Sequence, residues 1–195
     1  MAFQTNPNFN NMNANNGEAP KKKNIRVAKI DTDDGRLNIT VWKSDRGGIY
    51  VVLNMMAAAG KDPQTGRVMY EQRMPNELPS IYMNASSALG LLDAVNMQKC
   101  NEPANLNFQY KVRDNVLNVS SEGTNIKMTL ESPKTGSRNM TFQGMQVGTG
   151  VVHPAWHYFQ KMLKMGVDKV MYARLYPDEF NVNTGADDVD ETSPW

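Results

Sequence analysis

The chain has 195 residues, of which 40% are hydrophobic and 21% charged, and this composition can bury the core of one sizeable domain. One cysteine, Cys100, excludes an intramolecular disulfide framework, and with only two histidines it also excludes a Cys/His zinc finger. The sequence has no apolar run near the roughly 18–20 residues of a membrane span, and its start lacks the pattern of a secretory signal. We therefore expect a cytoplasmic protein with no membrane partner.

The two ends of the chain differ from its body in charge and complexity. Residues 1–23 are rich in asparagine and end in three lysines, a composition that predicts a disordered arm with a basic end. All 21 lysines and arginines lie within residues 21–180, together with 15 of the 20 acidic residues. Residues 181–195 carry four acids and no base, and we expect a disordered acidic tail. The net charge of +1 therefore conceals a basic body.

The body begins with a series of strands. Apolar alternation and turn residues predict strands at residues 25–30, 36–43, 49–55 and 68–74, and residues 80–83 can continue the fourth. A helix follows, with Asn84 as its N-cap and apolar residues on one face up to about residue 98.

The same order then recurs. Strands are predicted at residues 106–112, 116–120, 124–131 and 138–143, followed by a helix with Pro154 in its first turn. The apolar stripe of that helix contains Trp156, Phe159, Met162 and Leu163, and residues 170–176 are predicted as a last strand-like piece.

Short sequence echoes accompany this recurrence. Residues 37–40 (Leu-Asn-Ile-Thr) resemble residues 117–120 (Leu-Asn-Val-Ser), and the Pro-x-Thr-Gly turn at 63–66 reappears at 133–136. We interpret residues 24–180 as one domain built of two ββββα repeats, 24–100 and 104–180. Strands that follow one another without intervening helices indicate antiparallel sheets with helices packed on one side, an α+β fold.

The outward faces of these sheets combine cations, amides and aromatic rings. Leu37, Ile39 and Val41 are expected to face the core, so the alternating pattern turns Trp42 outward. A tryptophan on an outward sheet face is unusual unless another group stacks on its ring. This combination suits single-stranded nucleic acid, because cations neutralise phosphates and aromatic rings stack on any base. The candidate nucleic-acid-binding residues, on the outward faces and their margins, are Arg26, Arg36, Trp42, Lys43, Arg46, Tyr50, Tyr70, Arg73, Lys111, Arg113, Lys127 and Arg138. The alternative is a solvated sheet face whose aromatic residues cover a protein partner or pack beneath the Asn-rich arm.

The tail strengthens the nucleic-acid interpretation. Its last residues resemble the C-terminal tip of bacterial single-stranded DNA-binding proteins and the acidic, aromatic-ended tails of some bacteriophage replication proteins, although the terminal Ser-Pro-Trp departs from the bacterial pattern. The residues that carry the resemblance are Asp187, Asp188, Asp190, Glu191, Pro194 and Trp195. The resemblance implies that the tail recruits replication or recombination proteins and competes with DNA for the binding groove. It also implies a viral source, and then the host cytoplasm.

The duplicated ββββα pattern resembles the Whirly-type fold, in which two such units display curved sheets to single-stranded nucleic acid. The resemblance covers roughly residues 24–170 and rests on element order, since the Lys-Gly-Lys-Ala signature of the plant members is absent. An OB-type barrel is the alternative.

Motifs for other chemistry are weak. His153 and His157 have a spacing that could share a metal, but no His-Glu-x-x-His motif is present, and a capping or surface pair is the simpler interpretation. No phosphate-binding loop of the G-x-x-x-x-G-K-[ST] type occurs. We expect no enzyme, no cofactor and no metal.

The hypothesis is a protein that binds single-stranded DNA without sequence specificity in replication, recombination or repair. A virion structural or assembly protein and an RNA-binding regulator are the alternatives, and a homo-oligomer is compatible with each.

Overall fold

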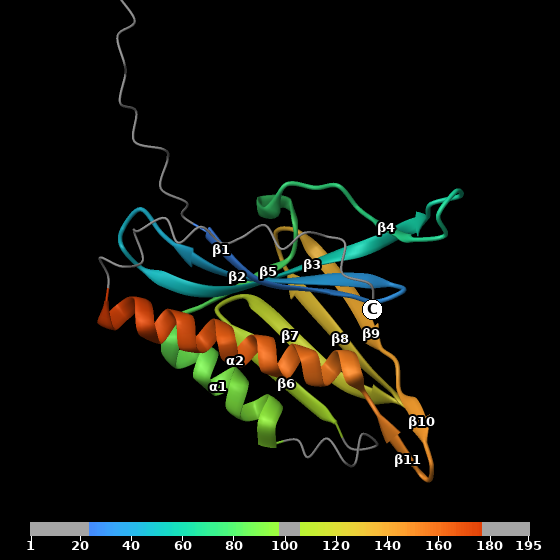
Figure 1. The fold of residues 1–195 in the computed structure, drawn as a ribbon. Helices are drawn as coiled ribbons and strands as arrows, with labels where there is room; N and C mark the ends of the chain where they lie inside the picture. The colour runs from blue at the N-terminus through green and yellow to red at the C-terminus, as the bar shows by residue number, and fades with distance from the viewer. Residues whose placement is uncertain (1–23, 98–105, 177–195) are drawn as a thin grey trace, which may run out of the picture.

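The computed structural model describes residues 24–97 and 106–176, and it has an α+β fold of antiparallel sheets and two helices (Figure 1). Our expectations for the N-terminal arm, Cys100 and the acidic tail lie outside the described residues. The first part of the chain forms β1 (Asn24–Asp31), β2 (Gly35–Lys43), β3 (Ile49–Lys61), β4 (Val68–Tyr70), a short 3₁₀ turn (Pro75–Glu77), β5 (Ser80–Met83) and α1 (Ala85–Met97). The second part forms β6 (Asn107–Val112), β7 (Asn115–Glu122), β8 (Asn125–Ser132), β9 (Gly136–Phe142), β10 (Met145–Val147), β11 (Gly150–Val152) and α2 (Pro154–Leu175).

The first sheet has the order β1–β2–β3, with β5 on the other side of β3 and β4 paired to the far end of β3. Alternate residues of β2 are buried, as expected for a sheet with one face on the core. The strand β3 is long enough to take part in both pairings, and the sheet curls strongly as it passes from β5 to β4 (Figure 1).

The second sheet has the order β6–β7–β8–β9, and β10 and β11 form a separate two-stranded hairpin. The two sheets approach each other where β9 contacts β2 and β3. Gly35 at the start of β2 is required there, because a Cβ at this position would lie 2.7 Å from the carbonyl oxygen of Asn139 in β9.

One hydrophobic core connects the inner faces of both sheets with the two helices. α1 begins after Asn84, whose Oδ1 accepts the Ser87 backbone N–H at 2.8 Å, which confirms the predicted N-cap. α2 lies along β1, β2 and β3, and its Trp156 and Phe159 form an aromatic cluster with Phe142 of β9. The helices thus cover the inner faces and leave the outer faces of the sheets to other contacts (Figure 1).

The structure corrects two predicted strands. Residues 170–176 are not a strand: α2 continues to Leu175, because Val170 and Ala173 extend the buried stripe of the helix. The strand predicted at 68–74 ends at Tyr70, and 80–83 is a separate strand paired with β3 rather than its continuation. No helix of the described residues is long and apolar enough to cross a membrane.

Candidate nucleic-acid interface

Cross-strand pairing arranges the outer face of the first sheet in rows. Paired residues of antiparallel strands point to the same face, so Trp42 lies beside Tyr50. The next row runs across the whole sheet as Arg26, Thr40, Val52 and Tyr82. The row of Trp42 and Tyr50 therefore lies next to the row that contains Arg26 and Tyr82.

These three rings form one aromatic cluster, which we define as Trp42, Tyr50 and Tyr82. The ring centroids of Trp42 and Tyr50 are 5.7 Å apart, and those of Trp42 and Tyr82 are 5.6 Å apart in a T-shaped contact. Trp42 and Tyr50 are half-buried, whereas Tyr82 is 43% exposed. The cluster therefore combines a fixed geometry with accessible ring surface.

Amides occupy the middle of this face. Asn38 and Asn54 are paired across β2 and β3, and Ser80 of β5 completes their row. Asn54 and Ser80 are buried and hydrogen-bonded to each other.

A second aromatic position lies at the other end of β2. The Arg36 guanidinium stands 4.1 Å from the ring centroid of Tyr70, and it donates two hydrogen bonds to Asp31, at 2.5 and 2.7 Å. The Tyr70 hydroxyl donates to the Thr32 carbonyl oxygen at 2.9 Å. Burial raises the pKa of Tyr70, and the charge of Asp31 raises it further. At a strand rise of about 3.3 Å per residue, the Arg36–Tyr70 pair is roughly 20 Å from Trp42.

Four candidate cations lie at the margins of the outer faces. Lys43 lies off the first outer face, and Arg73 and Arg138 make ion pairs. Lys43 pairs with Ile49 and so has the phase of the inward-facing residues of β2, whereas Arg46 is exposed in the following turn. Arg138 donates to Glu71 at 2.6 Å from Nε and 2.9 Å from Nη2, and Arg73 lies 3.1 Å from the same carboxylate. Arg138 thus joins β9 to the segment after β4.

The outer face of the second sheet is rich in amides and carries charges of both signs. Gln109 donates to Asn118 and Asn118 donates to Glu131, each at 2.9 Å. Lys111 is exposed, and Lys127 forms an ion pair with Glu122 at 3.2 Å. Arg113 lies in the turn between β6 and β7, at a positive φ of 56°. In the described part of this sheet, the aromatic side chains of β6 and β9 pack toward the core.

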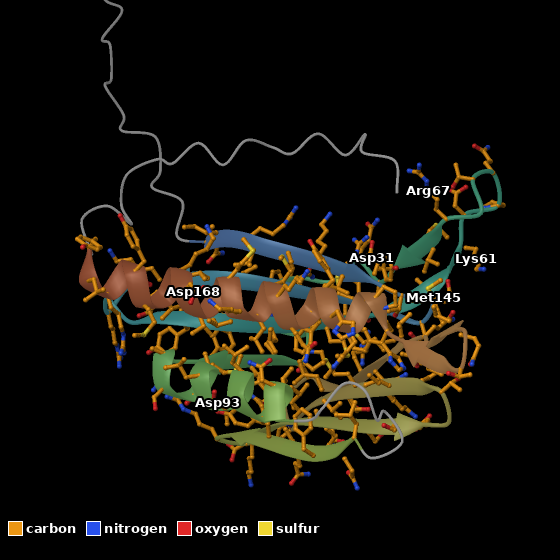
Figure 2. The ribbon with its side chains drawn as sticks, turned by 60° about the horizontal axis from the view of Figure 1, so that its bottom comes forward. Asp31, Lys61, Arg67, Asp93, Met145 and Asp168 are labelled. Carbon is orange, nitrogen blue, oxygen red and sulfur yellow. The ribbon has the colours of Figure 1, made fainter. Side chains whose placement is uncertain are left out.

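The structure does not bring all candidate residues together. Lys111 in β6 and Lys127 in β8 belong to the second sheet, whereas Trp42 belongs to the first, and Figure 2 shows the two sheets on different sides of the molecule. The residues that share the first outer face are Arg26, Arg36, Trp42 and Tyr50, with Tyr70 and Arg46 at its ends.

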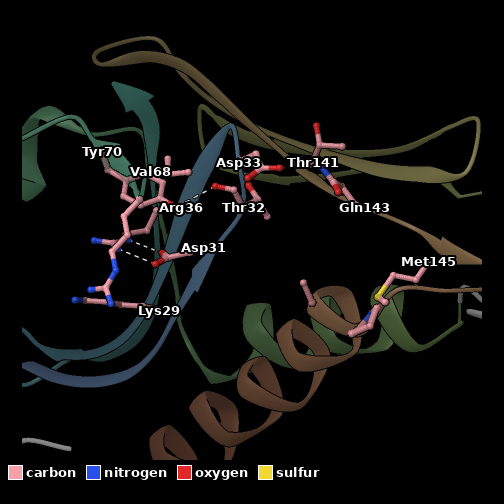
Figure 3. A pocket seen from close by; sticks show the side chains of 13 residues that line it. Lys29, Asp31, Thr32, Asp33, Arg36, Val68, Tyr70, Thr141, Gln143 and Met145 are labelled. Atoms are coloured by element: carbon pink, nitrogen blue, oxygen red, sulfur yellow. Dashed lines mark hydrogen bonds and ion pairs between the residues drawn. The ribbon is translucent and has the colours of Figure 1, made fainter. Parts of the chain in front are cut away.

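An open cleft of about 700 Å³ adjoins this face at its Arg36 end (Figure 3). Its walls come from the β1–β2 hairpin, β4, the start of α2 and the segment from β9 to β10. The residues that line it are Lys29, Asp31, Thr32, Asp33, Arg36, Arg67, Val68, Tyr70, Thr141, Gln143, Met145, Pro154 and Ala155.

Sequence reasoning missed two residues of the first outer face. Tyr82 could have been found, because Ile81 and Met83 face the core and strict alternation then turns Tyr82 outward. Lys29 could not, since a β-bulge between Arg26 and Ala28 shifts the phase of β1 and aligns Lys29 with Asn38.

The histidine pair has structural contacts. His153 is buried and its Nε2 donates to the Thr124 carbonyl oxygen at 2.8 Å, so its side chain does not cap α2 although it occupies the N-cap position. His157 is exposed and contacts Gln160. Within residues 24–97 and 106–176, no group of three or more His, Cys, Asp or Glu side chains could hold a metal ion.

In comparisons with known proteins, the chain matches no protein-family model and no curated protein.

Proposed function

We propose that the protein binds single-stranded DNA without sequence specificity, on the outer face of the first sheet. The observation that carries this proposal is the aromatic cluster Trp42–Tyr50–Tyr82 beside Arg26. Val52 of the same face is buried, so the rings also take part in a small apolar cluster, but the exposed ring of Tyr82 remains accessible for stacking on unpaired bases.

Each part of the face has a role in this mechanism. Bases stack on the rings of the cluster, which accept any base because every base has a π-face. Arg26 and Arg46 neutralise phosphates and release their counterions. The stacked Arg36–Tyr70 pair offers a further planar surface roughly 20 Å along the strand.

The order of elements supports a finer proposal for the fold. Both parts of the chain run as an antiparallel set of strands followed by a helix, β1–β5 with α1 and β6–β9 with α2. We propose that they are the two units of a duplicated, Whirly-like domain. The curled first sheet also fits the OB-type alternative, in which a partly closed sheet binds the strand. In either fold, the acidic tail would recruit replication or recombination proteins.

A fluorescence titration with poly-dT tests the function. We expect binding to quench the emission of Trp42, and the logarithm of the affinity to fall linearly with the logarithm of the salt concentration. Duplex DNA of the same length is the control and should bind more weakly. Absence of any binding to poly-dT would contradict the proposal and favour the assembly protein, and tighter binding to poly-U would favour the RNA-binding alternative.

A further inference from the structure

Two hairpins project from the same end of the molecule (Figure 1), and residues of both line the open cleft. The arm is residues 58–70, made of the end of β3, the loop and β4. The β10–β11 hairpin is residues 145–152. Arg67, Val68 and Tyr70 of the arm line the cleft on one side, and Met145 lines it on the other (Figure 3).

The arm contributes Arg67 and Tyr70 to the lining of the cleft and carries a second cation, Lys61, just outside that lining. Lys61 is paired with Val68, so its side chain lies on the same face of the arm as Val68 and Tyr70. Both Lys61 and Arg67 are exposed. The Asp62 carboxylate accepts the backbone N–H groups of Gln64 and Thr65, each at 2.8 Å, which holds the loop in one shape.

The β10–β11 hairpin presents an apolar surface. Met145 is paired with Val152, and Val147 shares their face two residues along β10. Their exposed fractions are 57% for Met145, 59% for Val147 and 40% for Val152. A lone two-stranded hairpin is marginally stable, so three exposed apolar side chains on one face indicate a surface that gains from being covered.

The acidic residues of the cleft limit what can enter it. Asp31 is paired with Arg36, and Asp33 accepts a hydrogen bond from Gln143 at 3.0 Å. Lys29 and Arg36 line the cleft together with these carboxylates and offset their charge, so this part of the cleft attracts phosphates less than the basic arm does. An occupant should therefore place its phosphates on the basic arm and its uncharged, planar groups against Met145.

The cleft is continuous with the outer face of the first sheet. Arg36 and Tyr70 belong to both, because Arg36 lies in the outer row of β2 and both residues line the cleft. A strand that stacks on Trp42 and follows β2 would reach this pair and then pass between the hairpins.

We infer that the cleft between the arm and the β10–β11 hairpin is a second subsite for the same unpaired DNA strand. This inference rests on the proposed function. Lys61 and Arg67 bind phosphates, while Met145 and Val147 contact the bases, as apolar side chains do in other complexes with nucleic acids. The cleft then extends the site beyond the aromatic cluster and determines the length of strand that one molecule covers.

Oligothymidylates of two lengths test the inference by fluorescence anisotropy. The short one, of about 4 nucleotides, should occupy only the aromatic cluster, and the long one, of about 16, should reach the cleft. For the double variant Lys61→Gln/Arg67→Gln, we expect the salt dependence of long-oligomer binding to lose about 1.4 from its log–log slope, at about 0.7 per phosphate. Binding of the short oligomer should not change.

The matched control is the double variant Lys134→Gln/Lys169→Gln, which removes the same charge from exposed positions outside both the arm and the lining of the cleft. It should bind both oligomers like the unmodified chain. A second measurement uses 4-thiothymidine in the long oligomer, which should photo-crosslink to residues 145–152.

The outcomes separate the two proposals. If the unmodified chain binds neither oligomer, the proposed function is wrong. If it binds both, but the Lys61/Arg67 variant changes neither slope or lowers the affinity for both lengths equally, the function stands and the second subsite is wrong. Crosslinks confined to the first sheet would also overturn the subsite.

Discussion

At the scale of single residues, Trp42 and Tyr82 carry the interpretation of the outer face. Their rings contact each other edge to face, and the ring centroid of Tyr50 lies 5.7 Å from that of Trp42. A protein surface rarely keeps three rings in contact on a sheet face unless they meet a ligand or partner. The exposed ring of Tyr82 is the easiest of the three to test, because its removal leaves little empty space in the core.

We expect Tyr82→Ala to weaken poly-dT binding about tenfold, because one base–aromatic stack contributes about 1–3 kcal/mol. Tyr158→Ala is the matched control: Tyr158 is 44% exposed, against 43% for Tyr82, but lies on α2. Anisotropy titrations at one salt concentration measure both variants. Equal affinities for the two would remove Tyr82 from the site.

At the scale of elements, two carboxylates fasten the first sheet to β9. The Asp34 carboxylate accepts the backbone N–H and the hydroxyl of Thr141, at 2.8 and 2.6 Å. Glu71 accepts Arg138 of β9 and the backbone N–H of Ala57. These contacts hold the β1–β2 hairpin and the base of the arm in place, so they also shape the cleft.

Both carboxylates have a lowered pKa. Burial raises the pKa of Asp34, but the hydrogen bonds from Thr141 and Thr32 outweigh it and leave the pKa below 3.8. The hydrogen bond from Arg138 lowers the pKa of Glu71 below 4.5. A carboxyl whose pKa is lower in the folded state stabilises the fold above its unfolded pKa. That stabilisation is lost as the pH falls from about 4.5 through the folded values.

We therefore expect Glu71→Gln to lower the free energy of unfolding by about 1–3 kcal/mol at neutral pH, since it weakens charged hydrogen bonds that are mostly shielded from water. The difference from the unmodified chain should shrink as the pH falls from about 4.5, where Glu71 of the unfolded chain becomes protonated, through the lower pKa of Glu71 in the folded state. Urea unfolding at several pH values measures this.

Glu122→Gln is the control for that prediction, because its ion pair with Lys127 is exposed and should contribute less than about 1 kcal/mol. A Glu71 variant as stable as the Glu122 variant at every pH would show that the Arg138 contact does not fasten the sheets.

At the scale of the whole molecule, the two outer faces differ in chemistry as well as in direction. The first carries the aromatic cluster and the cleft at its end, and the second carries an amide network with charges of both signs. A single strand that follows the first face does not need the second. We therefore interpret Lys111 and Lys127 as outside the main path of the DNA.

Removal of residues 181–195 should tighten poly-dT binding most at low salt, because the acidic tail would compete with phosphates for the cations of the body. The measurement is a salt series of anisotropy titrations with the full chain and the truncated chain. As a control, neutral substitutions at Asp187, Asp188, Asp190 and Glu191 should reproduce the effect. An unchanged affinity would contradict competition by the tail.

How much the sequence predicted depends on the range of the interactions involved. Strand alternation placed Trp42 and Tyr50 on an outer face, and the Asn84 cap and Pro154 located the helix starts, because these signals are local. The sequence did not predict that α2 continues over residues 170–175, because Val170 and Tyr172 have high strand propensity. Packing of α2 against the first sheet stabilises the helix there instead.

The amino-acid sequence by itself determined the antiparallel α+β class, the basic body and the outward aromatic rings, since each follows from residue order within one element. Tertiary structure alone decided which cations accompany those rings. The bulge in β1 places Lys29 on their face, Arg138 binds Glu71, and Lys111 lies in the other sheet from Trp42. Such placements depend on contacts between residues far apart in the chain, and no local pattern encodes them.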